Sequence, residues 1–214
     1  MILAVLSAKG GTGKSTVSLN LAGTLASQNM RILLIDADPQ GSIAKWSKIR
    51  KQKYPDVIVH PSPVQKKETK KAGKKYDLTI FDSPPTFKRR MQSIMKASDI
   101  LIIPVSPGFT DLWSTRKLID IYFEEKEKHP TLEARLLINR IDRRTKIGRE
   151  FRNTLGKLSI PILMTEIPQR VVYPEAWQSG ITVDRMKYQS AGLEDFRSLG
   201  TEVTRWLKKY ARKK

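Results

Sequence analysis

The chain alternates between short, continuous apolar runs and longer segments in which apolar residues recur at helical spacing. Runs of strand length occupy residues 2–6, 31–36, 56–60, 77–82, 99–105 and 134–140, and a further one is expected at 160–165. Runs that are apolar on nearly every residue, and rich in Ile, Leu and Val, are typical of a parallel sheet covered on both faces.

Helical patterns fill the segments between these runs. They are expected at residues 14–28, 42–51, 88–96, 112–128, 145–158 and 193–210. Strands and helices in alternation predict an α/β fold, a doubly wound and mostly parallel sheet with helices on both faces. No second-domain boundary is evident, so residues 1–214 are interpreted as a single domain. Ligands of such sheets bind at the carboxyl ends of the strands.

One segment breaks the alternation. Residues 61–75 read PSPVQKKETKKAGKK, with six lysines and no apolar periodicity. This composition predicts a lysine-rich surface loop or a frayed helix.

The strongly basic net charge of the chain points to a negatively charged partner. The 214 residues carry 40 Lys and Arg against 21 Asp and Glu, a formal net charge of +19. Such an excess attracts polyanions, nucleic acid before anionic membrane, although it can also serve solubility alone. The chain has no cysteine, which excludes disulfides, thiolate nucleophiles and iron–sulfur clusters. Without a signal-peptide pattern or roughly 20 consecutive apolar residues, we expect a cytoplasmic protein.

The first apolar run leads directly into a glycine-rich loop. Residues 8–16 read AKGGTGKST, and a helical pattern follows. Strand, loop and helix in this order are what a phosphate-binding loop (P-loop) requires, because small residues let successive N–H groups point at phosphates and the helix adds its positive end. Lys14 would reach the β- and γ-phosphates, and the Ser15 hydroxyl would bind Mg²⁺. The predicted nucleotide-binding residues here are Gly10, Gly11, Thr12, Gly13, Lys14, Ser15 and Thr16.

Two further strand ends carry carboxylates. Asp36 and Asp38, in LLIDADPQGS, are two residues apart and would project together at the carboxyl end of the sheet. Beside a magnesium nucleotide they suit ordering of the metal and of water, whereas the alternative is a plain turn, since DPQG is good turn chemistry. Asp82 ends the apolar run LTIFD, where a P-loop protein usually has an acidic residue that holds Mg²⁺ directly or through water.

Taken in order, the motifs KGGTGKST, DADPQGS, FDSPP and IPQRVVYPEA resemble those of the ParA/MinD family of deviant Walker-A ATPases. The resemblance covers nearly the whole chain and is closest to the short plasmid-partition ParA type, which lacks an N-terminal operator-binding domain. Alanine at position 8 and the additional Lys9 are the family's own departure from the ordinary P-loop. The resemblance implies a P-loop ATPase with ATP and Mg²⁺ as cofactors.

The same resemblance assigns catalytic roles to Lys9, Lys14 and Asp38. Lys9 would reach across a nucleotide-sandwich homodimer to the partner subunit's phosphates. A cation that acts only when two subunits meet would link ATP binding to dimerisation. Asp38 would orient the attacking water, and Asp36 would support Mg²⁺ through its water shell, in a metal site with Ser15 and Asp82.

Three residues are matched to the adenine end of the site. Asn139 and Arg140 lie where the family contacts the base, and Pro168 lies in the loop that closes over it. The alternative for Asn139 is a strand-end cap.

Basic residues of the later helices are the candidates for DNA contact. The resemblance implies that the ATP-bound dimer binds DNA without sequence specificity, in a manner that salt weakens steeply. A solvated face is the alternative for each candidate. The candidates are Arg170, Arg185, Lys187, Arg205 and Lys208.

Residues 191–214 are interpreted as a C-terminal helix with a basic tail. An apolar stripe marks this helix, formed by Leu193, Phe196, Val203, Leu207 and Tyr210 with Trp206 beside them. Such a stripe could lie on a membrane, as in the MinD branch, or pack against the domain, and we expect packing.

These observations predict a DNA-partition ATPase. ATP would drive dimerisation, the dimer would coat nucleoid DNA, and a centromere-binding partner, either ParB-like or a ribbon-helix-helix adaptor, would stimulate the hydrolysis that releases it. Turnover would be weak without that partner, which locks the water-orienting group in place. The alternative is positioning of another cargo or of division machinery, with membrane association not expected. A small-molecule synthetase leaves the basic charge unexplained, and a DNA-compacting protein leaves the intact nucleotide motifs unexplained.

Overall fold

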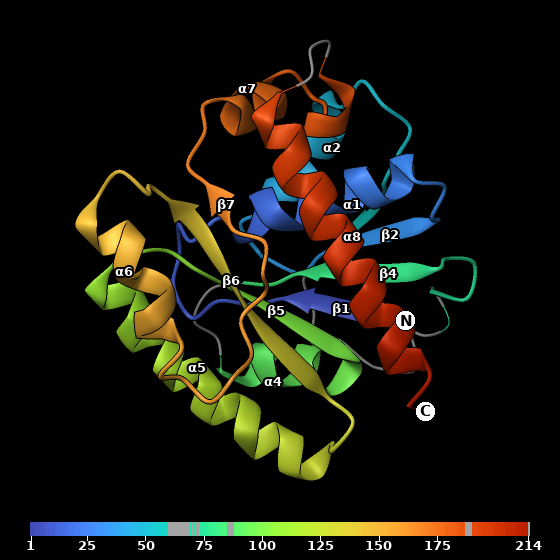
Figure 1. The fold of residues 1–214 in the computed structure, drawn as a ribbon. Coiled ribbons are helices and arrows are strands. Elements are labelled where there is room, and N and C mark those ends of the chain that lie inside the picture. Colours follow the sequence, from blue (N-terminus) through green and yellow to red (C-terminus); the bar gives the residue numbers. More distant parts are fainter. Residues whose placement is uncertain (60–68, 70, 72, 85–87, 187–189, 214) are drawn as a thin grey trace.

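The computed structural model describes residues 1–59, 69, 71, 73–84, 88–186 and 190–213. Its strands form one parallel sheet in the order β3-β2-β4-β1-β5-β6-β7 (Figure 1). They are β1 (Ile2–Val5), β2 (Ile32–Asp36), β3 (Asp56–Val59), β4 (Leu78–Asp82), β5 (Ile100–Val105), β6 (Glu133–Ile141) and β7 (Ile167–Pro168). The strand order reverses at β1, so the loop after β1 lies at the switch point where α/β sheets bind ligands.

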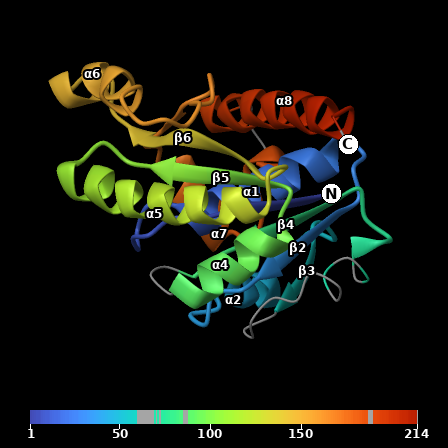
Figure 2. The same cartoon turned by 90° about the horizontal axis from the view of Figure 1, so that it is seen from below.

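Helices cover both faces of this sheet, as the sequence predicts. They are α1 (Lys14–Ser27), α2 (Ser42–Ile49), α4 (Lys88–Ala97), α5 (Phe109–Lys128), α6 (Lys146–Leu155), α7 (Val172–Gln178), the 3₁₀ turn η1 (Val183–Arg185) and α8 (Ala191–Ala211). One apolar cluster joins the sheet to α1, α2, α7 and α8, and the other joins it to α4, α5 and α6. Figure 2 shows α8 and α5 on opposite sides of the sheet. The prediction of the fold class is confirmed.

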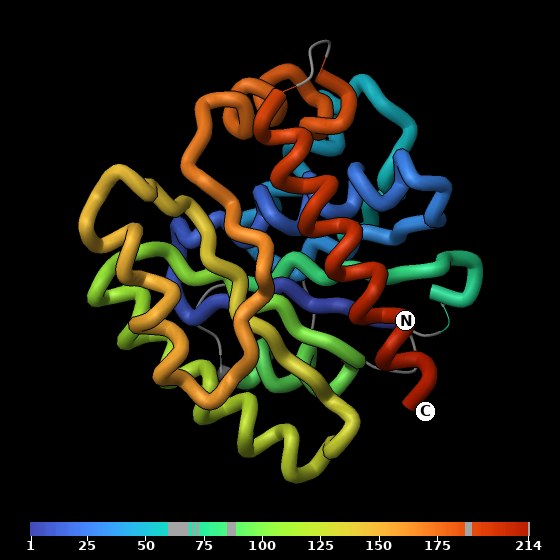
Figure 3. Tube along the Cα trace, viewed as in Figure 1, coloured from blue at the N-terminus to red at the C-terminus, as the bar shows by residue number. Residues whose placement is uncertain are grey.

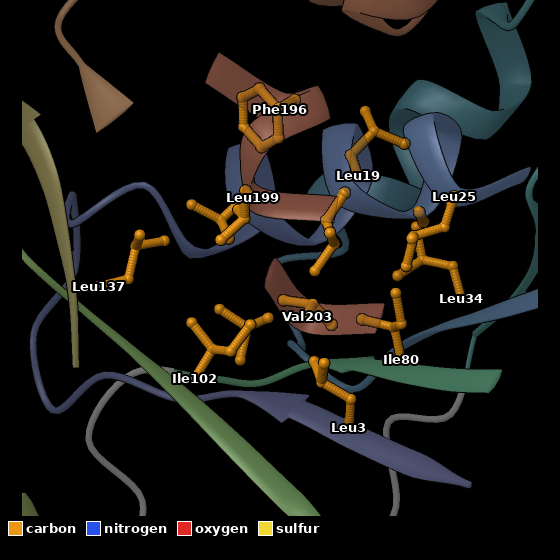
Figure 4. Packing of buried hydrophobic residues seen from close by; sticks show 14 of the residues in the cluster. Leu3, Leu19, Leu25, Leu34, Ile80, Ile102, Leu137, Phe196, Leu199 and Val203 are labelled. Atoms are coloured by element: carbon orange, nitrogen blue, oxygen red, sulfur yellow. The ribbon is translucent and has the colours of Figure 1, made fainter. Parts of the chain in front are cut away.

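The two clusters follow from the alternation of side chains along each strand. In β1, Leu3 and Val5 pack on the α1–α8 side, whereas Ile2 and Ala4 pack on the α4–α5 side. Figure 4 shows Leu199 and other α1 and α8 side chains above the first of these faces. A strand buried on both sides has no polar position, which is why the sequence shows continuous apolar runs.

The chain ends lie together at the amino ends of the strands. The tube trace in Figure 3 shows α8 running back across the sheet toward the start of the chain. Lys213 Nζ donates to Glu133 at the start of β6 (2.6 Å), and the Met1 carbonyl accepts from Thr79 (2.9 Å). The opposite edge of the sheet, where the strands end, is therefore free of both chain ends and is formed by the loops that follow the strands.

The expected strand at 160–165 is wrong. Only Ile162 makes an isolated bridge to Leu136, and the last strand of the sheet is β7 further along the chain. Pro161 has no N–H to donate to a ladder. The N–H groups of Met164 and Thr165 donate instead to the Glu202 carboxylate on α8, at 2.8 and 2.9 Å.

The C-terminal helix packs against the domain, as expected. Its apolar stripe, including Phe196, Val203 and Trp206, is buried in the cluster shared with α1. None of the helices in the described part of the chain is long and apolar enough to cross a membrane. Most of the lysine-rich segment 61–75 lies outside the described residues.

Candidate active site

The loop between β1 and α1 has the shape of a phosphate cradle. Gly11 and Gly13 adopt left-handed φ values of 80° and 84°, which favour glycine. A side chain on Gly13 would also lie 2.4 Å from Asn139 Nδ2. A Cβ at Gly10 or Gly11 would meet only open space, so the cradle has room for a ligand.

Lys14 begins α1 and is 6% exposed. Its Nζ donates to the backbone carbonyl of Lys9 at 3.0 Å. Burial lowers the pKa of Lys14, while the charges of Asp82 and Asp38 raise it. Among the described residues, this buried ammonium donates to one backbone carbonyl, so it keeps N–H donors for an anionic ligand in the cradle.

Asp82 ends β4 beneath the start of α1. Its Oδ2 accepts from the Ser15 hydroxyl at 2.7 Å, and its Oδ1 accepts from the Ser18 hydroxyl at 3.0 Å. Burial raises the pKa of Asp82 to about 7, against the lowering effect of these two bonds. Ser18 is not predicted by the P-loop pattern, although it lies one turn after Ser15 on the same helix face.

Asp36 and Asp38 have different surroundings, although the sequence places them together. Asp36 is fully buried, and its two oxygens accept from the N–H groups of Asp38 (3.1 Å) and Ala44 (2.8 Å). Burial raises the pKa of Asp36. Asp38 lines the pocket over the cradle, and its Oδ1 accepts from the Gln40 N–H at 2.9 Å. Asp36 therefore anchors the loop that presents Asp38.

One pocket of about 530 Å³ gathers most of the predicted site. Its lining combines the P-loop with loops from the far end of the chain. Among the predicted residues it includes Gly10, Gly11, Gly13, Lys14, Ser15, Thr16, Asp38, Asn139, Arg140 and Pro168, and it adds Gln40, Ser42, Gln169, Arg170, Tyr173 and Pro174.

Asn139 and Arg140 hold the P-loop from the end of β6. The Asn139 amide donates to the Thr12 carbonyl at 2.6 Å, and the Arg140 guanidinium donates to the Gly11 carbonyl at 2.7 Å. The family resemblance matches these two residues to the adenine base and does not predict their contacts with the P-loop, because no spacing rule links positions more than a hundred residues apart. The adenine contact stays a prediction.

We expect Asn139→Ala to lower nucleotide affinity by about tenfold, because the buried Thr12 carbonyl loses its partner and the loop loosens. Fluorescent-nucleotide titration measures the change. Asn153→Ala, at an exposed position of α6, is the matched control. Unchanged affinity of the Asn139 variant would remove this supporting role.

Lys9 contacts the first turn of α5. Its Nζ donates to Thr110 Oγ1 at 3.0 Å and forms an ion pair with Asp111, and its side chain is 46% exposed. An acidic residue is favourable in the first turn of a helix, which by itself explains Asp111. Nothing in the sequence connects Asp111 to the P-loop.

The residues present fit a magnesium nucleotide. Besides the cradle, the Thr12 hydroxyl oxygen is buried without a hydrogen-bond partner in the described part of the chain. Ser15 and Asp82 would supply two oxygens for Mg²⁺, which commonly takes few protein ligands and completes its shell with phosphate and water. When bound, the metal would neutralise phosphate charge.

The candidate DNA contacts lie on different elements, although Arg205 and Lys208 are both exposed on α8, three residues apart. Arg170 pairs with Asp195 at 2.6 Å and lines the nucleotide pocket. Arg185 lines a second hollow, Arg205 a third, and Lys208 is exposed on α8. Lys187 lies outside the described residues.

Known proteins that are similar to this chain include nucleotide-binding proteins, as the phosphate cradle would lead us to expect. The family model of the CobQ/CobB/MinD/ParA nucleotide binding domain matches residues 3–183. The chain is 34% identical to "Maintenance of carboxysome distribution protein A" of Halothiobacillus neapolitanus, over 85% of each chain. It is 30% identical to the protein of the same name from Gloeobacter kilaueensis, over 97% of this chain and 96% of that one. It is 26% identical to the sporulation initiation inhibitor protein Soj of Bacillus subtilis, over 94% of this chain and 97% of Soj.

Solved structures share the fold. The septum site-determining protein MinD from Pyrococcus horikoshii, complexed with Mg-ADP, has a TM-score of 0.76 and 22% identity over 98% of each chain. An ATP complex of a McdA variant from Cyanothece has a TM-score of 0.75 and 19% identity over 95% of this chain and 96% of that one. The first of these structures holds Mg-ADP and the second holds ATP, which are the cofactor types that the sequence predicts for this chain.

The matched family model spans most of the chain and includes the P-loop, Lys14 and Asp82. The chain therefore belongs to the CobQ/CobB/MinD/ParA nucleotide-binding family, as a P-loop ATPase of the ParA/MinD type.

Proposed function

We propose that this chain is a positioning ATPase, which distributes a cellular cargo by switching between an ATP-bound and an ADP-bound state. The observation that carries the proposal is its likeness to two carboxysome distribution proteins over most of each chain. The nucleotide site supports the proposal, because Lys14, Ser15 and Asp38 line one pocket and the Ser15 hydroxyl donates to Asp82. The cargo is then a large body inside the cell, and nucleoid DNA is the surface to which the ATP state is held.

DNA partition, the main expectation from the sequence, is the second candidate. The net charge of +19 and the likeness to Soj favour it. The two functions differ in what is moved. Under the proposal, cells that lack this protein keep their plasmids, but their protein-bounded cargo is clustered instead of evenly spaced. Plasmid loss with evenly spaced cargo would favour partition instead.

The switch in this proposal is a homodimer that forms on ATP. Lys9 would leave its own subunit's Asp111 and bind the phosphates across the dimer interface. An ion pair whose lysine is 46% exposed is worth only about 0–1 kcal/mol, so clustered phosphate charge can replace it. The contact with Asp111 would thus hold Lys9 beside the interface in the monomer.

We expect Lys9→Ala to bind ATP as a monomer and to lose the ATP-dependent dimer. Asp111→Asn, which releases Lys9 without changing the size of the side chain, should dimerise at an equal or lower ATP concentration. Sedimentation velocity with ATP and with ADP measures both. Lys45→Ala, at an exposed position of α2, is the control for loss of one charge. A Lys9 variant that dimerises like the wild type would contradict the switch.

A further inference from the structure

A second hollow lies at the edge of the sheet opposite the nucleotide pocket. It has a volume of about 800 Å³ and lies where β2, β3 and β4 begin, beside η1. Five of the thirteen described residues that line it are basic, against one carboxylate, Asp56. We name it the basic groove, and its five cations are Arg31, Arg50, Lys53, Lys75 and Arg185.

Three of these cations are exposed and weakly engaged. Lys53 and Lys75 are exposed and have no ionic or hydrogen-bond partner within the described ranges. Arg185 is 45% exposed and contacts the carboxylate of its neighbour Asp184 at 3.3 Å. The charges of Lys53 and Lys75 therefore have no local ion-pair partner within the described ranges, and an anion in the groove would meet these two ammonium groups and the remaining N–H donors of Arg185.

The other two cations are held in place by the fold. The Arg31 guanidinium pairs with Asp77 at 2.7 Å, and an Arg50 N–H donates to the Pro55 carbonyl at 2.8 Å. An arginine has five N–H donors, so each keeps donors for a further acceptor. These two side chains give the groove a wall of positioned N–H donors, although the charge of Arg31 is balanced by Asp77.

The shape and composition of the groove favour a nucleic acid over a membrane. Tyr54 is 49% exposed, and the Arg185 guanidinium lies 5.9 Å from its ring. The groove is concave, so it can receive a ridge of phosphates, whereas a flat lipid surface binds apolar side chains that protrude. Cations along a concave surface are typical of contact with a phosphate backbone.

We propose that the basic groove binds the phosphate backbone of a nucleic-acid duplex, and that this groove, rather than the basic face of α8, provides the main DNA contact of the ATPase. Arg185 is the only DNA candidate from the sequence that lines it among the described residues. Contacts to phosphate do not read base sequence, so binding at this groove would be independent of the DNA sequence. The nucleotide dependence of this contact rests on the proposed function.

The P-loop helix connects the two sites. On α1, the Asn20 side chain accepts from the Val183 N–H of η1 at 2.9 Å and donates to the Thr16 carbonyl at 2.9 Å. Gly23 lies against Thr182, where a Cβ would come within 2.4 Å of the hydroxyl oxygen. Through these contacts, a movement of α1 on nucleotide binding would be passed to η1 and to Arg185.

The test compares two variants that lose the same charge. The groove variant is Lys53→Ala/Lys75→Ala/Arg185→Ala, and the control is Arg205→Ala/Lys208→Ala/Lys209→Ala on α8. Both replace exposed side chains. Fluorescence anisotropy with a random-sequence duplex of about 40 base pairs, over a series of salt concentrations with a non-hydrolysable ATP analogue, measures affinity. Sedimentation and nucleotide titration report whether each variant still binds ATP and dimerises.

The groove variant is expected to bind the duplex at least about tenfold more weakly, and its salt slope should fall by about 3, one for each phosphate that the three cations no longer neutralise. The α8 control should stay within about threefold of the wild type. Equal weakening in both variants, or weakening only in the α8 variant, would overturn the proposal. Tighter binding of the wild type to phosphatidylserine vesicles than to the duplex, with the groove variant impaired on vesicles, would also overturn it.

The result separates this inference from the proposed function. If the groove variant alone fails to bind the duplex but the wild type binds equally with ATP analogue and ADP, the groove is supported and the switch fails. If binding depends on ATP and the groove variant keeps it, the switch is supported and the groove fails. If the wild-type protein dimerises on ATP but binds no duplex, the proposal for the groove fails and the ATP-dependent dimer is still supported.

Discussion

Lys14→Ala is expected to lower ATP hydrolysis by at least about 10²–10³-fold, since removing one preorganised donor to developing phosphate charge costs this much. Nucleotide affinity should fall as well, because Lys14 is the buried cation of the cradle. A phosphate-release assay measures turnover. Titration with a fluorescent nucleotide measures affinity.

The stability of the nucleotide-free Lys14 variant should not fall. Burial lowers the pKa of Lys14, which means that the folded chain holds the charged form at a cost. The Lys9 carbonyl that Lys14 contacts also accepts from the Ser7 hydroxyl at 3.2 Å, so the substitution does not strand it. Denaturant unfolding checks this expectation, with Lys45→Ala as the surface control. Full turnover by a folded Lys14 variant would contradict the assignment of the cradle.

Much of the fold is predictable because its signals are local. The apolar runs at β1, β2, β4 and β5 predict buried parallel strands, and the loop before α1 predicts a phosphate cradle from residue types alone. Asp82 is predictable because it ends such a run. Each of these features depends on neighbours in the chain, which a sequence displays directly.

The features that the sequence does not predict depend mostly on contacts between residues far apart in the chain. Helix α7 has seven residues, too few for helical periodicity to appear. The expected strand at 160–165 keeps only the bridge of Ile162 to Leu136, and the N–H groups of Met164 and Thr165 donate instead to Glu202, almost forty residues later. The contacts of Lys9 with Asp111 and of Asn139 with Thr12 join residues 102 and 127 positions apart. Propensity and spacing carry no information on such pairs.

Asp38→Ala is expected to lower ATP hydrolysis by about 10²–10³-fold and to leave ATP affinity within a few-fold of the wild type. Asp38 lines the pocket, and its loop is held by the buried Asp36 through the N–H groups of Asp38 and Ala44. A carboxylate fixed in this way is suited to orient water and is not needed to cradle phosphate. Asp38→Asn tests the charge alone, and Asp120→Ala, at an exposed position of α5, is the control.

The Asp38 variant should also separate binding from release. If hydrolysis ends the ATP state, the variant bound to ATP should remain dimeric in sedimentation runs during which the wild type returns to monomer. It should stay on a DNA duplex for the same period, because nothing resets Lys9 or the basic groove. A variant that hydrolyses slowly but leaves the dimer at the wild-type rate would show that release does not require hydrolysis. The pocket would then be an ATPase site without being the switch.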